Sequence, residues 1–205
     1  MHKRHLLALY RLFFGVLTLW AVWVQFAQGS TRESFDPVNF LSFFTIESNI
    51  IAAVLFIVSA ALTARGSQST ALTILRGAAT LYMLVTGVVY SLLLSGLEES
   101  LQTTIPWVNA VLHYIMPAAV LFDWCIDIPK RRMLFRRALV WLAFPAAYLF
   151  YSLVRGAVVG WYPYPFLNPA YYGYAGVVVT CVGILGGMVA LIWLLTKSTH
   201  IVNRK

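Results

Sequence analysis

The sequence predicts an all-α protein that crosses a membrane as a bundle of six helices. Its 205 residues are 60% hydrophobic and only 11% charged, whereas a soluble domain is about half apolar and about a quarter charged. Because backbone in lipid must satisfy its own hydrogen bonds, apolar runs of about twenty residues are expected to be membrane-spanning helices. We expect a single domain, residues 1–205. The runs cover residues 6–28, 40–63, 72–95, 106–127, 137–156 and 173–196.

The first and last runs each raise one question. The first follows basic residues, as a signal peptide does, but it is too long and contains Arg11. We therefore interpret it as a retained helix. In the last run, Gly183 and Gly187 stand at a spacing that allows helices to approach closely. Packing within the bundle is the favoured interpretation, and contact with a second copy of the chain is the alternative.

Basic residues alternate between the connections, and this sets the expected orientation. The connections between the basic ones are poor in lysine and arginine, and one of them carries Glu98 and Glu99. The positive-inside rule therefore predicts that both termini lie in the cytoplasm. The same bias accounts for most of the net charge of +8, so no nucleic-acid partner is expected. The basic residues are Lys3, Arg4, Arg65, Arg76, Lys130, Arg131, Arg132, Arg136, Arg137, Lys197, Arg204 and Lys205.

Two runs begin with polar side chains at a depth where lipid is expected. In the second run, Ser42, Thr45 and Asn49 have a spacing that places them on one helical face. In the fourth run, Asn109 and His113 are one turn apart and also share a face. Both runs start at the outer side in the predicted topology. We therefore expect these groups to lie at similar depth, roughly 5–12 Å below the outer boundary.

A hydroxyl beside a neutral imidazole is typical of nucleophilic catalysis, in which histidine takes the proton of the attacking alcohol. If the two faces meet, Ser42 or Thr45 is the candidate nucleophile and His113 the candidate base. Asn109 is suited to orient the imidazole or to donate to an oxyanion. The alternative is structural: the hydroxyls bond back to their own helix, and His113 bridges two helices.

Charges inside the runs need partners, because an unpaired charge within a membrane is disfavoured. Arg11 and Asp123 lie near the inner ends of their runs, and Glu47 and Arg155 lie towards the outer side. We therefore predict the ion pairs Arg11–Asp123 and Glu47–Arg155. For the two arginines, the alternative is that the side chains extend to the lipid headgroups.

The connection before the last run is rich in proline and aromatic residues. Its prolines prevent a regular helix, and its aromatic rings suit a membrane interface. It lies on the same side as the predicted polar layer. Tyr164 and Phe166 therefore either cover a lipid-facing site or belong to an ordinary aromatic belt.

Three segments together resemble the family of the androgen-induced and androgen-dependent TFPI-regulating membrane proteins. They are Phe40-Leu41-Ser42-Phe43, Trp107-x-Asn109-x-x-x-His113 and Tyr164-Pro165-Phe166-Leu167. Uncharacterised bacterial six-helix membrane proteins are more similar still, through Phe44 to Asn49, His113 to Pro117, and Asp123-Trp124. The resemblance covers most of the chain in span count and motif order. It implies a multi-pass protein of a bacterial plasma membrane.

The resemblance also implies an intramembrane hydrolase of fatty acid esters of hydroxy fatty acids, because the animal members use a threonine nucleophile and a histidine. By position, that threonine corresponds to Ser42 and the histidine to His113. Thr45 is a second hydroxyl nearby, so the identity of the nucleophile stays open. The alternative is a non-catalytic protein that binds lipid or transports a small molecule. The expected substrate is a membrane lipid or fatty acid ester, contacted or oriented by Asn49, Trp107, Asn109, Tyr164 and Phe166.

No cofactor or metal is predicted. Cys125 and Cys181 lie within or at the ends of apolar runs and lack the spacing of metal ligands. We expect both to be buried as small hydrophobic residues. His113 by itself cannot form a metal site.

Overall fold

The computed structural model describes residues 2–67, 69–98 and 104–202. Within these residues it contains helices and no strand, and six helical spans are long and apolar enough to cross a membrane. The protein is therefore an all-α, multi-pass integral membrane protein. Glu99, Arg204 and Lys205, used in the orientation prediction, lie outside the described residues. The spans are Lys3–Gly29, Phe44–Ala64, Thr70–Leu94, Pro106–Ile126, Phe135–Val159 and Pro169–Ile201.

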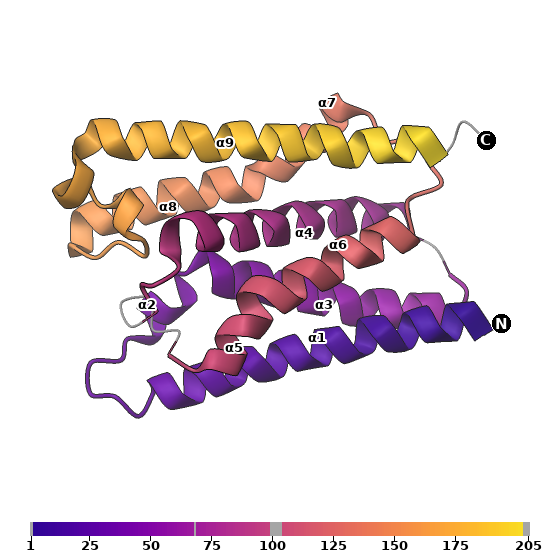
Figure 1. The fold of residues 1–205 in the computed structure, drawn as a ribbon, viewed down its shortest axis with the longest axis horizontal. Helices are drawn as coiled ribbons and strands as arrows, with labels where there is room; N and C mark the ends of the chain where they lie inside the picture. Colours follow the sequence, from indigo (N-terminus) through magenta and orange to yellow (C-terminus); the bar gives the residue numbers. More distant parts are fainter. Residues whose placement is uncertain (1, 68, 99–103, 203–205) are drawn as a thin grey trace.

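The spans lie along the long axis of the molecule, and both termini lie at the same end (Figure 1). The helix α4 is central and contacts α3, α6 and α9, while α1 packs along α3. Several spans combine more than one helical segment. The elements are α1 (His2–Gly29), α2 (Pro37–Leu41), α3 (Phe44–Ala64), α4 (Thr70–Val89), η1 (Tyr90–Leu94), α5 (Pro106–Ala110), η2 (Val111–Ile115), α6 (Met116–Ile126), α7 (Phe135–Ala138), η3 (Leu139–Leu142), α8 (Ala143–Val159), η4 (Pro165–Leu167) and α9 (Pro169–Val202).

The second predicted run is two helices rather than one. The side chain of Asp36 caps α2 by accepting a hydrogen bond of 2.7 Å from the Val38 N–H, and Pro37 occupies the first helical position. After α2 ends, Phe43 has an extended backbone (φ −81°, ψ 126°), and α3 begins at the next residue. Ser42 therefore belongs to the turn between two helices, and its predicted place on one helical face with Thr45 and Asn49 is wrong.

Two spans contain a π-helical turn, η1 on the third span and η2 on the fourth. Pro117 follows η2, and because it has no N–H it cannot donate to the carbonyl of His113, four residues earlier. Gly87 of α4 packs against this place: a Cβ there would lie 3.2 Å from both the His113 carbonyl oxygen and Pro117 Cβ. Such π turns are frequent at functional sites, and here they hold Tyr90 and His113.

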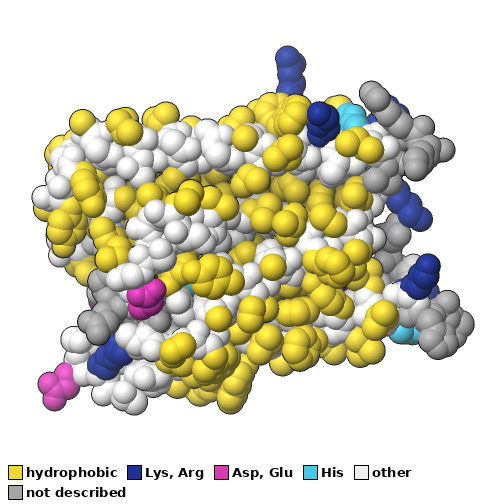
Figure 2. Space-filling model, viewed as in Figure 1, with side chains coloured by type: hydrophobic (Ala, Val, Ile, Leu, Met, Phe, Trp, Pro, Cys, Tyr) yellow, Lys and Arg dark blue, Asp and Glu magenta, His cyan; other side chains and the backbone are white. Residues whose placement is uncertain are grey.

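The surface separates charge by end. Hydrophobic side chains cover the length of the bundle in Figure 2, and most visible lysine and arginine side chains lie toward the end with both termini. Visible acidic side chains lie at the opposite end. This is the distribution on which the positive-inside prediction of cytoplasmic termini depends.

Two sequence interpretations of packing are wrong. A Cβ on Gly183 or Gly187 would meet nothing within 4 Å, so these glycines do not pack within the bundle. The reason is that α9 turns other side chains inward, among them Met188 and Ile192. Contact with a second copy of the chain stays a prediction. Of the cysteines, Cys125 is exposed on α6 and Cys181 is only partly buried.

Candidate functional site

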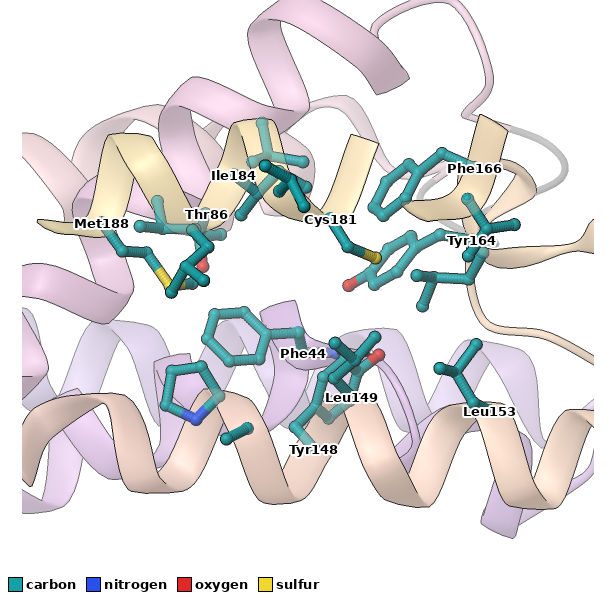
Figure 3. A pocket seen from close by; sticks show the side chains of 18 of the residues that line it. Phe44, Thr86, Tyr148, Leu149, Leu153, Tyr164, Phe166, Cys181, Ile184 and Met188 are labelled. Atoms are coloured by element: carbon teal, nitrogen blue, oxygen red, sulfur yellow. Dashed lines mark hydrogen bonds between the residues drawn. The ribbon is translucent and has the colours of Figure 1, made fainter. Parts of the chain in front are cut away.

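A cavity of about 410 Å³ lies between α4, α8 and α9 and reaches the start of α3. In Figure 3, Tyr164 and Phe166 lie at one end, Met188 lies at the other, and side chains of α8 form one wall. Most lining side chains are aliphatic or aromatic, and the hydroxyls among them belong to Thr45, Thr86, Tyr148 and Tyr164. An elongated apolar space with few polar groups suits a hydrocarbon chain.

The polar end of this cavity is built by Thr45 and Tyr164. The Thr45 N–H donates to the Tyr164 hydroxyl at 3.2 Å, and the two side-chain oxygens are 3.4 Å apart. The ring of Phe166 stacks on that of Tyr164, with centroids 5.2 Å apart. Burial raises the pKa of Tyr164, so its phenol stays protonated at neutral pH. Tyr164 and Phe166, the two aromatic residues singled out in the connection between α8 and α9, therefore both line the cavity.

Ser42 is engaged elsewhere. Its hydroxyl donates to the Val38 carbonyl at 2.6 Å and lies 2.8 Å from the Tyr151 hydroxyl. Tyr148 donates to the Ser42 carbonyl at 3.0 Å and accepts from the Phe44 N–H at 3.3 Å. These contacts tie the α2–α3 turn to α8. Ser42 is buried and does not line the cavity.

His113 ends a chain of hydrogen bonds whose direction is fixed. The Gly96 N–H lowers the pKa of the Glu98 carboxyl, which stays ionised and can only accept. The Tyr90 hydroxyl donates to Glu98 at 2.9 Å, so its oxygen accepts from Asn109 Nδ2 at 2.6 Å. The Asn109 amide oxygen then faces His113 Nδ1 at 2.6 Å.

This chain sets the tautomer of His113. Nδ1 also lies 3.2 Å from the Asn109 backbone carbonyl, so both of its neighbours are acceptors and Nδ1 must carry the proton. Neutral His113 therefore has an unprotonated Nε2. The ring is held by stacking on Tyr90, with centroids 3.7 Å apart and planes at 16°. His113 is buried in this position.

We predicted that the hydroxyl of Ser42 or Thr45 contacts the His113 imidazole. Among the described residues this contact does not form, and His113 bonds only to Asn109. The physical reason is that His113 turns toward Tyr90, while Ser42 lies beyond the helix break. Asn49 links the two regions: its Nδ2 donates to the Thr45 carbonyl at 2.8 Å and to the Leu112 carbonyl at 3.1 Å. It acts as a bridge between α3 and the fourth span.

Neither Asn49 nor Trp107 lines the cavity. Asn49 is fully buried between helices, and Trp107 is substantially exposed at the start of α5. Asn109 is also absent from the cavity wall and instead orients His113. These three residues, which we expected to contact substrate, therefore do not face the cavity.

Of the two predicted ion pairs, the inner one forms. Arg11 Nε lies 2.6 Å from Asp123 Oδ1, and both side chains are buried. The outer pair, Glu47–Arg155, is wrong. Arg155 Nη2 donates to Asn39 Oδ1 at 2.6 Å and lies 3.8 Å from Asp36 Oδ2. The reason is the separate helix α2, which brings these two side chains beside α8.

Several members of these networks were not predicted from the sequence. Arg76, assigned to a loop, is buried in α4 and lies 2.7 Å from Asp123 Oδ2 and 2.9 Å from Asp127 Oδ2. The spacing of the two aspartates, one helical turn apart, was a usable signal. The roles of Tyr90, Tyr148 and Tyr151 had none, because tyrosine near a span end is ordinary in membrane proteins.

Among the described residues, no three histidine, cysteine, aspartate or glutamate side chains form a group that could hold a metal ion. Comparison with protein-family models, curated proteins and solved structures finds no match. Function is therefore inferred from the site itself, since a helical bundle alone implies none.

Proposed function

We propose that the protein is an intramembrane lipid ester hydrolase with His113 as its general base. The observation that carries the proposal is the direction of the hydrogen bonds from Glu98 through Tyr90 and Asn109, which leaves His113 Nε2 free to accept a proton. A structural histidine needs only partners, whereas a base also needs a fixed tautomer. The proposed setting is lipid metabolism in the plasma membrane of a bacterium.

The substrate class follows from the cavity. Its apolar walls suit a fatty acyl chain, and its polar end offers the hydroxyls of Thr45 and Tyr164 to an ester group. The Tyr164 phenol, protonated at neutral pH, can donate a hydrogen bond to the ester carbonyl oxygen as negative charge develops there. Fatty acyl esters, including esters of hydroxy fatty acids, have this combination of a long apolar chain and one polar linkage.

We propose Thr45 as the nucleophile, since it lines the cavity and Ser42 does not. Thr45 Oγ1 bonds to the ester carbonyl carbon as its proton passes to His113 Nε2. The bond to the leaving alcohol breaks, and that alcohol takes the proton. Water then attacks the acyl-threonine and gives a proton to Nε2; the acid leaves, and Thr45 Oγ1 regains the proton.

These reaction steps require the Thr45 hydroxyl and His113 to approach each other when substrate binds. Hydrogen bonds between catalytic groups are often long or unformed in free enzymes and shorten in the complex with substrate. Asn49 already couples the two elements, through the carbonyls of Thr45 and Leu112. His113 does not itself line the cavity, so the movement that the proposal needs is a shift of the fourth span relative to α3 that brings His113 to Thr45.

The test is covalent labelling of purified protein by a lipophilic fluorophosphonate. We expect labelling of the wild type and its loss in Thr45→Val and His113→Ala. Thr86→Val is the matched control, because it removes a hydroxyl from the same cavity and should leave labelling intact. Loss in Ser42→Ala with retention in Thr45→Val would instead identify Ser42 as the nucleophile. Unlabelled wild type, or equal labelling of wild type and His113→Ala, contradicts the proposal.

A second candidate, a non-catalytic lipid-binding protein, is favoured because, among the described residues, His113 bonds to Asn109 and to no hydroxyl. It predicts that a photoactivatable fatty acid crosslinks to the cavity equally in wild type and His113→Ala, while neither protein hydrolyses esters. A small-molecule transporter has less support, because the cavity is apolar along most of its length. Crosslinking combined with hydrolysis separates the two leading functions.

A further inference from the structure

We infer that the end of the bundle with both termini holds a binding site for a phosphate-bearing anion. A cavity of about 680 Å³ opens there between the start of α1, the turn from α3 to α4, and residues 127–131. It lies at the other end of the spans from Thr45 and His113, so it is independent of the proposed hydrolase site. Its charged lining residues are Lys3, Arg4, Arg11, Arg76, Asp127, Lys130 and Arg131.

The charge balance of this cavity is strongly positive. Arg11 and Arg76 are paired with Asp123 and Asp127, so these four side chains compensate one another. The remaining lining cations are Lys3, Arg4, Lys130 and Arg131, and within the described residues no ion pair joins them to an acidic side chain. The chain has five other acidic residues. Glu33, Asp36, Glu47 and Glu98 lie in or near the connections at the opposite end, and Glu99 is outside the described residues.

Two further features point to an anion. The N-cap Ser69 and the first residue of α4, Thr70, line the cavity. The Ser69 hydroxyl accepts from the Leu72 N–H, and the earlier N–H groups of a first helical turn have no partner within the helix and attract anions. Ser59, deeper in the cavity, is 1% exposed, and its hydroxyl has no hydrogen-bond partner among the described residues. A bound oxygen-rich group would satisfy that hydroxyl.

Orientation alone does not explain this arrangement. The positive-inside rule requires basic residues at this end but not that they surround one cavity. Arg136 and Arg137 of α7, at the start of the fifth span and at the same end of the bundle, are exposed and do not line the cavity. They provide a natural comparison, since they share the orientation role without the geometry.

The chemistry of the ligand follows from its surroundings. Arginine and lysine around a helix N-terminus match the tetrahedral oxygens and multiple charge of phosphate. Two sources carry this group at a membrane surface: the headgroup of an anionic phospholipid and a soluble phosphate compound. Basic pockets between membrane-spanning helices accept the first, and a cavity open to water also admits the second.

The test measures thermal unfolding of the full chain by tryptophan fluorescence in phosphatidylcholine nanodiscs. One arm adds inorganic pyrophosphate, and the other replaces a fifth of the lipid with phosphatidylglycerol. Binding near saturation should raise the melting temperature by roughly 5 °C. Lys130→Gln/Arg131→Gln should abolish the rise. Arg136→Gln/Arg137→Gln, which removes the same charge from the same end of the bundle, should retain it.

A rise only with pyrophosphate assigns a soluble ligand, and a rise only with phosphatidylglycerol assigns a lipid headgroup. A rise in both arms assigns a phosphate site open to either source, provided that the Lys130/Arg131 variant loses it. Absence of any rise in wild type overturns the inference. So does an equal loss in the two double variants, because a diffuse surface charge then accounts for the binding.

Discussion

Tyr90 has two roles at His113, and they can be separated. Its ring stacks on the imidazole, while its hydroxyl orients the Asn109 amide. Tyr90→Phe keeps the ring and removes the hydroxyl, so Asn109 loses the partner that fixes its orientation. We expect about a tenfold slower fluorophosphonate labelling, a fraction of the 10²–10⁴ typical of a general base itself. Tyr114→Phe, a change in the neighbouring exposed tyrosine, should leave the rate unchanged; equal rates in all three proteins would refute the orienting role.

The buried arginines and aspartates make a second prediction at this scale. Arg11→Met leaves Asp123 with less compensation inside the membrane, and breaking such a network costs about 3–5 kcal/mol. Unfolding in a denaturing detergent should show this loss, with Arg65→Met, a change at an exposed arginine of the same end, as the control. Arg11→Met/Asp123→Leu should recover part of the stability. A single variant as stable as the control would show that the network contributes little.

The sequence predicts the partner of a side chain only where depth in the membrane decides that partner. Arg11 and Asp123 were paired because both lie at the inner ends of their spans, and depth is encoded in the hydropathy pattern. Arg155 was assigned to Glu47 by the same logic, but its partners come from α2, a helix that the pattern did not separate. The tyrosine contacts depend on helix rotation, which a single sequence does not encode.

At the scale of elements, the break before α3 has a tertiary cause. The first N–H groups of α3 donate to tyrosine hydroxyls from distant segments, Phe44 to Tyr148 and Thr45 to Tyr164. The N-cap of α3, Phe43, makes no side-chain capping hydrogen bond, so the sequence carries no local signal for the start of this helix. The sequence therefore predicted one helix from residue 40 to residue 63. The six spans themselves were predictable, because their length and apolar composition are local properties.

The close approach of α4 to the π turn gives a prediction for Gly87. A leucine there would push against the His113 carbonyl and Pro117, and overpacking of this kind costs about 1–3 kcal/mol. Gly186→Leu is the control, since a Cβ at Gly186 meets nothing within 4 Å and the gain in helix propensity is the same. Thermal unfolding should therefore show a lower melting temperature for Gly87→Leu only. Equal shifts would mean that the helices separate easily.

At the scale of the whole molecule, both the sequence and the structure bear on the orientation of the protein in the membrane. The alternation of basic connections predicts cytoplasmic termini, and the structure brings both termini to one end (Figure 1). In a background with Cys125→Ser and Cys181→Ser, a membrane-impermeant maleimide should label Ser34→Cys in intact cells. Ser67→Cys should react only after the cells are permeabilised. The reverse pattern would invert the topology and place the basic cavity outside the cell.

The most direct test of the proposed function is hydrolysis of a long-chain fluorogenic acyl ester by purified protein in nanodiscs. The proposal predicts turnover by wild type and a fall of about 10²-fold or more in His113→Ala. It also predicts weaker hydrolysis of a short-chain ester that leaves the apolar cavity unfilled. Absence of turnover by folded wild type, or equal turnover by His113→Ala, would contradict it and leave lipid binding as the function of the cavity.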